Sequence, residues 1–268
     1  MLTKRLIACF DIIDGQVTKA VRFQDNIDVA PAGELAERMY AAGIDELIFY
    51  DVTASARKRG PDIETVKAVA SRVFIPFTVG GGIKDLADMY ETLKAGAEKI
   101  SVDSMAVRNP QIIAEGAKAF GSQCVVLSTQ VKRDKNMPSG YQVYIDGARV
   151  ATGLDALEWV KQGQELGAGE ICLNSIDNDG MLGGYDLALM QLMGKHLSVP
   201  LIASGGAGLP EHLRDLFNES EALAAIISSM LYSPRLERNY SVQELKAYLQ
   251  ECGIPVRPYV SPHAGDSA

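Results

Sequence analysis

Short apolar segments alternate along this chain with longer segments in which apolar positions recur at helical spacing. The short segments are typical of buried strands and the longer ones of amphipathic helices. The predicted strands are 5–10, 46–50, 77–79, 99–102, 124–129, 170–174, 201–203 and 224–227. The predicted helices are 33–42, 63–71, 86–96, 110–120, 155–166, 187–196, 210–217 and 242–252.

This alternation predicts an α/β fold in which helices cover the outer face of a parallel sheet. Eight strand-and-helix units in 268 residues favour a (β/α)8 barrel. A doubly wound open sheet is the alternative. We expect one barrel domain over residues 1–252 and a frayed tail at 253–268, which contains three prolines.

The two halves of the chain resemble each other. Segment 42–49 is matched by 166–173, and the glycine cluster at 79–82 is matched by 204–207. Such a repeat indicates a duplicated half-barrel, with halves at about 1–122 and 123–252. It favours the closed barrel, because two halves of four strands complete a ring.

Two connections between a strand and the next helix are long. Segment 14–31 is polar, and we expect it to be mobile. Segment 132–153 contains two strand-like runs, 141–145 and 149–151, around an Asp-Gly dipeptide, which predicts a hairpin. Long connections of this kind lie on the active-site face of a barrel.

Composition narrows the class of protein. The chain is 47% hydrophobic and 22% charged, which is ordinary for a soluble globular protein. It has no apolar run of membrane-spanning length and no secretory layout at its N-terminus, and its four cysteines lack metal or redox spacing. We therefore expect a cytoplasmic protein. A net charge of −8 argues against nucleic-acid binding, so an anionic substrate must be held by local donors.

The matched glycine clusters are the strongest candidate binding sites. Gly81 and Gly82 with Ser104, and Gly205 and Gly206 with Ser228, predict two phosphate-binding loops made of backbone N–H groups. The alternative is two tight turns between strand and helix. Other residues that follow strands at the same end join this predicted substrate-binding set: Asp103, Asp179 and Gly180.

Asp11 ends the first predicted strand and is a candidate general acid or base. The alternative is an aspartate that caps its own loop. The corresponding position on the fifth strand is Gln130, whose amide forms hydrogen bonds but exchanges no proton at neutral pH. Lys19, in the first long connection, is a candidate phosphate contact or a solvated loop lysine. The histidines show no ligand spacing, and we expect no metal site and no cofactor.

Four charged residues stand at the starts of predicted strands, at the opposite end of the barrel: Arg5, Glu46, Lys99 and Glu170. Two cations and two anions in one layer can form a closed charged ring. A purely structural ion-pair plug is the alternative.

These residues resemble a known family, the cyclase subunit of imidazole glycerol phosphate synthase, from residue 1 to about 258. The segments that carry the resemblance are 4–11, 51–55, 77–83, 120–126, 167–171, 177–186, 202–208 and 253–258. The resemblance implies a substrate with a phosphate at each end, a ribulosyl formimino aminoimidazole carboxamide ribotide. Its products would be imidazole glycerol phosphate and aminoimidazole carboxamide ribotide.

The resemblance also implies a partner glutaminase that docks on the barrel bottom and supplies ammonia. Ammonia would pass the four charged residues as a gate and cross the barrel to the substrate. Asp11 matches a catalytic aspartate, Lys19 a lysine near phosphate, and Asp45, Glu98 and Gln123 match the face that meets the glutaminase.

The chain departs from this family at its predicted catalytic end. The family usually has a second catalytic aspartate at Gln130, asparagine at Asp103 and threonine at Asn174. Two other functions fit the same residues. One is a paralogue that passes ammonia to another phosphorylated or nucleotide-linked acceptor. The other is a catalytically weak barrel that docks a glutaminase.

Overall fold

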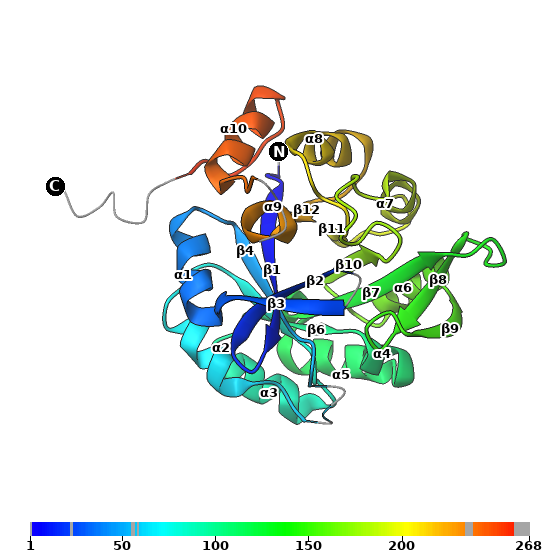
Figure 1. Ribbon diagram of the computed structural model, residues 1–268. Helices are drawn as coiled ribbons and strands as arrows, with labels where there is room; N and C mark the ends of the chain where they lie inside the picture. Colours follow the sequence, from blue (N-terminus) through cyan, green and yellow to red (C-terminus); the bar gives the residue numbers. More distant parts are fainter. Residues whose placement is uncertain (1, 22–23, 55–56, 58, 234–237, 260–268) are drawn as a thin grey trace.

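The computed structural model describes residues 2–21, 24–54, 57, 59–233 and 238–259. Within these residues, eight parallel strands form a closed ring, because β12 pairs with β1 and β7 pairs with β10 (Figure 1). The ring contains, in spatial order, β1 (Arg5–Ile13), β4 (Glu46–Asp51), β5 (Phe77–Gly80), β6 (Lys99–Val102), β7 (Val125–Arg133), β10 (Glu170–Ser175), β11 (Leu201–Ser204) and β12 (Ala224–Ile226). The predicted (β/α)8 barrel is confirmed, and the open sheet is excluded.

Helices surround the ring and cover its outer face (Figure 1). The main helices are α1 (Ala32–Ala41), α2 (Ile63–Ala70), α3 (Leu86–Lys94), α5 (Gln111–Phe120), α6 (Ala156–Glu165), α7 (Leu187–Gly194), α8 (Pro210–Glu219) and α10 (Val242–Glu251). The sequence pattern did not predict the shorter helices α4 (Ser104–Arg108), η1 (Ser122–Cys124) and α9 (Ser228–Tyr232).

The strands bury both faces, as a parallel barrel requires. On β1, Leu6 and Phe10 pack outward against the helices, whereas Ile7 lies in a separate cluster inside the barrel. Phe10 stacks on Phe49 of β4 with ring centroids 5.3 Å apart. Because side chains alternate along a strand, the inward series continues from Ile7 to Cys9 and Asp11. The same alternation on β7 carries the inward series from Val126 to Ser128 and Gln130.

Both long connections form antiparallel hairpins. The hairpin predicted within 132–153 is confirmed by β8 (Tyr141–Ile145) and β9 (Val150–Asp155). Segment 14–31, expected to be a mobile polar connection, instead forms β2 (Gln16–Val21), which pairs with β1, and β3 (Gln24–Pro31), which pairs with β2. The sequence pattern did not predict these two strands, because the segment is polar. Backbone hydrogen bonds between the strands, rather than an apolar face, hold much of the segment in place.

The expectation of a frayed tail is wrong for the part of it that is described. Val256 forms a bridge with Lys4 beside β1, and Ile254 and Val256 are both 5% exposed. The Tyr259 hydroxyl donates to the carbonyl of Ala41 at 3.2 Å. These contacts hold residues 253–259 against the barrel, and residues 260–268 lie outside the described residues.

One ion pair is buried at the bottom of the barrel. The Lys246 ammonium on α10 donates to Asp45 Oδ1 at 2.7 Å and to the carbonyl of Gly43 at 2.7 Å. Asp45 Oδ2 accepts from the backbone N–H of Leu6 at 2.9 Å. The two charged side chains are 3% and 2% exposed, so each depends on the other for compensation of its charge.

We therefore expect Lys246→Met to lower the free energy of unfolding by about 3–5 kcal/mol, because it leaves Asp45 buried without a cation. The control is Lys67→Met, which removes the exposed pair between Lys67 and Glu64 and should change stability by less than about 0.5 kcal/mol. Urea unfolding of both variants measures the difference. Equal effects would contradict a structural role for the buried pair.

Candidate functional site

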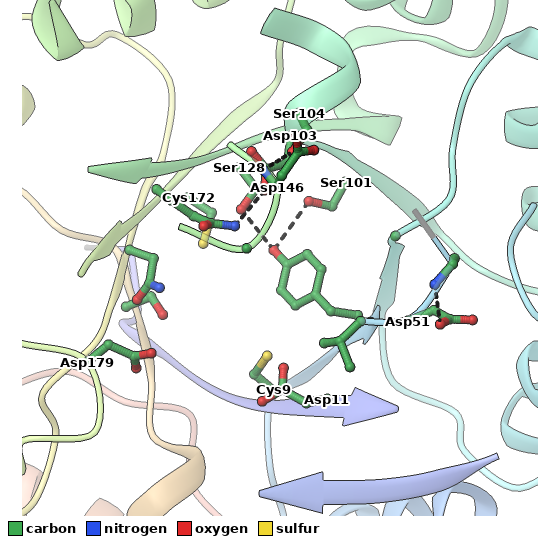
Figure 2. A pocket seen from close by; sticks show the side chains of 18 of the residues that line it. Cys9, Asp11, Asp51, Ser101, Asp103, Ser104, Ser128, Asp146, Cys172 and Asp179 are labelled. Carbon is green, nitrogen blue, oxygen red and sulfur yellow. Dashed lines mark hydrogen bonds between the residues drawn. The ribbon is translucent and has the colours of Figure 1, made fainter. Parts of the chain in front are cut away.

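A cavity of about 680 Å³ opens where the barrel strands end. Its lining includes most of the predicted substrate-site residues: Asp11, Gly81, Gly82, Asp103, Ser104, Gln130, Asp179, Gly180, Gly205, Gly206 and Ser228. Figure 2 shows Asp11 and Asp103 on opposite sides of this cavity. The fold therefore brings together residues that are more than two hundred positions apart in the sequence.

The first glycine loop follows β5. Gly81 has φ +85, and a Cβ atom there would lie 2.3 Å from the backbone oxygen of Asp51. Only glycine fits this approach without a backbone shift. Ser104, at the start of α4, lies beside the loop in the cavity wall, and its oxygen accepts the N–H of Asp146 at 2.9 Å.

The second glycine loop follows β11 and repeats this arrangement. Gly206 has φ +105, and a Cβ atom there would lie 2.1 Å from the carbonyl oxygen of Gly184. Ser228 starts α9, as Ser104 starts α4. The Ser228 hydroxyl both donates to the carbonyl and accepts from the N–H of Cys9, at 2.8 Å each, and so ties α9 to β1. Its side chain is thus engaged with the barrel wall.

The two loops face each other across the cavity. In the closed ring, β11 stands four strands from β5 in either direction, and β12 stands in the same relation to β6. The two glycine loops therefore flank one space. This arrangement suits a molecule with an anionic group at each end.

A carboxylate and an amide share the side of the cavity opposite Asp11. Gln130 Nε2 donates to Asp103 Oδ2 at 2.8 Å. Desolvation raises the pKa of Asp103 to about 7, and Asp146 adds to the rise, while the hydrogen bond from Gln130 and the charge of Arg108 oppose it. A carboxyl group with this pKa exchanges its proton readily near neutral pH.

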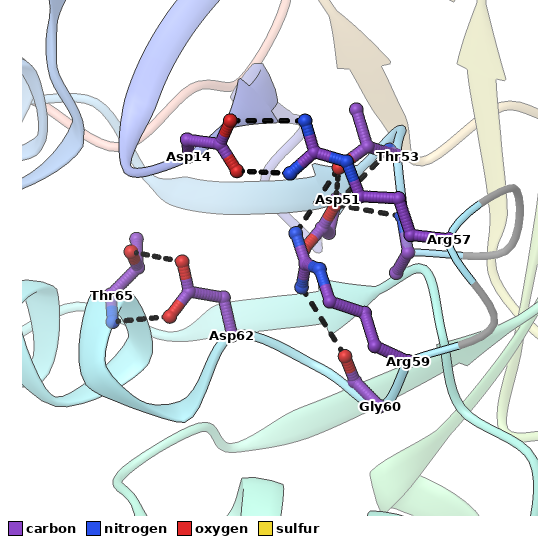
Figure 3. A network of polar contacts seen from close by, with 9 residues as sticks. Asp14, Asp51, Thr53, Arg57, Arg59, Gly60, Asp62 and Thr65 are labelled. Atoms are coloured by element: carbon purple, nitrogen blue, oxygen red, sulfur yellow. Dashed lines mark hydrogen bonds and ion pairs between the residues drawn. The ribbon is translucent and has the colours of Figure 1, made fainter.

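Several cations surround the cavity mouth that the sequence did not predict. Arg59 pairs with Asp51 at 2.6 Å and also donates to Thr53 and to the carbonyl of Gly60 (Figure 3). In the same network Arg57 pairs with Asp14. Three further cationic residues line the cavity: Lys84, Arg108 and Arg149. No local motif marks these residues, because the loops alone bring them to the mouth.

Tyr50 was also missed, and it lies at the floor of the cavity. Its hydroxyl lies 3.3 Å from Ser101 Oγ and donates to Ser128 Oγ at 3.1 Å. Burial raises its pKa well above 10, so the phenol stays neutral. Below it the barrel interior is lined by small and apolar side chains: Ile7, Ile48, Val126, Cys172, Ile202, Ala224 and Ile226.

The predicted role of Lys19 and the expected absence of a metal site both stay predictions. Lys19 lies on β2, with its backbone paired to Ile27, and its side chain lies outside the described part. In the searched part of the chain, no group of three or more His, Cys, Asp or Glu residues could hold a metal ion. No helix among the described residues has the length and apolar character needed to cross a membrane.

The four charged residues at the opposite end form a closed ring of ion pairs. Arg5 contacts Glu46 at 2.6 Å and Glu170 at 2.7 Å, and Lys99 contacts the same two carboxylates at 2.8 Å each. Burial tends to lower the pKa of Arg5, but Glu170 and Glu46 outweigh it and raise that pKa. Each charged group thus has two neighbours of opposite charge, and the four side chains form a continuous ring of ion pairs across the barrel bottom.

The three residues expected at a partner interface differ in exposure. Glu98 and Gln123 are exposed at the barrel bottom, where Glu98 accepts the N–H of Phe77 at 2.9 Å. Asp45, whose place at the partner interface stays a prediction, is 4% exposed and paired with Lys246. It sits beneath α10 because Lys246 neutralises its charge there.

Comparison with known proteins identifies the family. The model of a family described as "Histidine biosynthesis protein" matches residues 5–237. The chain belongs to this histidine biosynthesis family. It is 52% identical over 260 residues to the imidazole glycerol phosphate synthase subunit HisF of Desulfosudis oleivorans, covering 96% of this chain and 99% of the relative. The proteins of the same name from Desulfatibacillum aliphaticivorans and Syntrophobacter fumaroxidans are 50% and 49% identical, also over 260 residues.

The match to the histidine biosynthesis family runs from the first barrel strand through α9, so it includes both glycine loops and the charged ring. The similarity to HisF proteins extends further, over nearly the whole chain. The similarity to known proteins therefore covers the barrel scaffold and also the segments that form both of its ends.

We expect Gly81→Ala and Gly206→Ala to destabilise the protein more than Gly140→Ala. All three glycines have positive φ, but a Cβ atom at Gly140 meets nothing within 4 Å. The control should therefore lose only the conformational term of about 1–2 kcal/mol, whereas the other two must also move backbone. Thermal unfolding measures this, and equal shifts in Tm for Gly81→Ala and Gly140→Ala would contradict the close approach.

Proposed function

We propose that this protein is the ammonia-dependent cyclase subunit of an imidazole glycerol phosphate synthase. It converts a bisphosphorylated ribulosyl formimino aminoimidazole carboxamide ribotide into imidazole glycerol phosphate and aminoimidazole carboxamide ribotide. The observation that carries the proposal is the pair of glycine loops on opposite sides of one cavity. The kinship with HisF proteins at about half identity supports it.

The substrate spans the cavity with one phosphate at each glycine loop. Backbone N–H groups hold the phosphates, and the cations at the mouth reduce the repulsion from the protein's net charge of −8. The reacting centre then lies between the loops. Asp11, on the inward series of β1, faces it as an acid–base group.

Ammonia enters from the opposite end. It passes the ring of Arg5, Glu46, Lys99 and Glu170 and follows the apolar interior to the cavity floor at Tyr50. A small neutral molecule crosses such an interior at little electrostatic cost, whereas ammonium would leave its hydration behind. The ring therefore acts as a selective closure that opens when a partner docks.

A glutaminase subunit docks on the bottom face and releases ammonia there. Two large apolar side chains are exposed next to strand starts on that face, Leu2 at 76% and Phe74 at 81%. Exposed Glu98 and Gln123 provide a polar rim around the charged ring. Exposed large apolar side chains next to polar ones are typical of protein–protein interfaces.

The isolated chain should form both products when supplied with the substrate and a high concentration of ammonium chloride. We expect Asp11→Asn to lower kcat by about 10²–10⁴-fold, because it removes a proton-transfer group. The control is Asp215→Asn on α8, outside the cavity, which should leave kcat unchanged. Absorbance and chromatography of the products measure turnover. An inactive wild-type protein would contradict the proposed function.

We expect Phe74→Asp to weaken binding of the glutaminase subunit by at least about tenfold, because it replaces an exposed apolar side chain of the proposed interface with a charge. The control is Tyr90→Asp on α3, whose ring is 53% exposed on the side of the barrel. Isothermal titration with the purified glutaminase of the same organism measures both. Equal affinities for the two variants would argue against docking at the bottom face.

A further inference from the structure

Asp103 and Gln130 form a carboxylate–amide pair that the proposed mechanism has not used. Gln130 lies on β7, the strand opposite β1 in the ring, and Asp103 follows the neighbouring strand β6. Their hydrogen bond is 2.8 Å long, and both residues line the cavity. Figure 2 places Asp103 directly across the cavity from Asp11.

The amide is only half used by protein neighbours. Gln130 Nε2 donates a hydrogen bond to Asp103, whereas Gln130 Oε1 is buried with no hydrogen-bond partner among the described residues. On the next strand, Asn174 is paired in register with Gln130. Its Oδ1 is also buried with no hydrogen-bond partner among the described residues. Buried acceptors are normally satisfied. Donors on a bound substrate would satisfy these two, which places the substrate against the Asp103–Gln130 pair.

The charged groups near Asp103 leave its carboxyl group able to gain and lose a proton. Asp146, at the β8–β9 turn, stands near it as a second carboxylate, and Arg108 of α4 pairs with Asp146. Gln130 is the donor from β7. Arg108 is thus engaged with Asp146, and the group in direct contact with Asp103 is a neutral amide.

We propose that Asp103 is a second catalytic acid–base residue of this cavity, acting across from Asp11, and that Gln130 positions its carboxyl group. The proposal rests on the proposed function. Position 130 itself carries no titratable group. The geometry supplies a carboxyl group one hydrogen bond away from it.

The step assigned to the pair is the addition of ammonia to the keto carbonyl of the ribulosyl substrate. The nitrogen forms a bond to the carbonyl carbon, and the carbon–oxygen π bond breaks. The Asp11 carboxylate takes one proton from nitrogen, while the Asp103 carboxylic acid gives its proton to the carbonyl oxygen. The result is a neutral carbinolamine, with Asp11 protonated and Asp103 ionised. No other co-reactant is needed.

Asp103→Asn tests this with little structural change. Asparagine has the same shape, and its Oδ1 still accepts the hydrogen bond from Gln130. A structural or positioning role therefore predicts nearly unchanged kcat. The proposal predicts a fall in kcat of about 10²–10⁴-fold with external ammonia, together with loss of the decline in wild-type kcat above a pH of about 7. That decline follows because the acid form of Asp103 is the active form.

The matched variant is the exchange Asp103→Asn with Gln130→Glu. It moves the carboxyl group to the other end of the same hydrogen bond without changing the length of either side chain. We expect kcat to recover at least about tenfold relative to Asp103→Asn alone, with a shifted pH profile. Binding of the substrate without ammonium, measured by titration calorimetry, should be similar in all three proteins.

Three results would overturn the assignment. One is a kcat for Asp103→Asn within about threefold of wild type, and another is a change confined to KM. The third comes from carboxyl ¹³C NMR, in which the resonance missing from Asp103→Asn should titrate with a midpoint of about 7 in the wild type. Titration near the ordinary aspartate value would overturn the proposal without reference to turnover. An inactive wild-type enzyme would instead refute the proposed function, and with it the step assigned to Asp103.

Discussion

Closure of the parallel barrel is the constraint on which both ends of the molecule depend. Because β12 pairs with β1, the strand ends that carry Asp11, Gln130 and Ser228 meet at one rim. The strand starts meet at the other rim, where Arg5, which begins β1, reaches Glu170 of β10. An open sheet with the same sequence would separate these groups, since the outer strands would lie at its opposite edges.

The same constraint separates two kinds of electrostatics. At the bottom, four side chains neutralise one another in a closed ring, and no net charge remains at that layer. At the mouth, the proposed function assigns the attraction for anions to fixed backbone dipoles of the glycine loops. Such dipoles are suited to a chain with a net charge of −8, because they act over short distances and need no net positive charge.

The strand and helix pattern predicted the barrel because each buried strand is a short apolar run and each helix has an apolar stripe. The glycine clusters and the four charged strand starts could also be located from sequence. The predicted strand boundaries determine at which end of the barrel each of these residues lies. Tyr50 could not be found, because its partners Ser101 and Ser128 lie on other strands of the ring. Arg59 could not be found either, because a loop brings it to the cavity. The burial of Asp45 could not be predicted, because its ion-pair partner, Lys246, is 201 residues away in the chain.

The central claim is that the two glycine loops hold the two ends of a single molecule. Isothermal titration calorimetry tests it most directly, with inorganic phosphate and with the bisphosphorylated substrate in the absence of ammonium. The account predicts two phosphate ions per chain, one substrate molecule per chain, and displacement of both phosphates by that one molecule. A single phosphate per chain, or a phosphate that stays bound when the substrate saturates the protein, would contradict it.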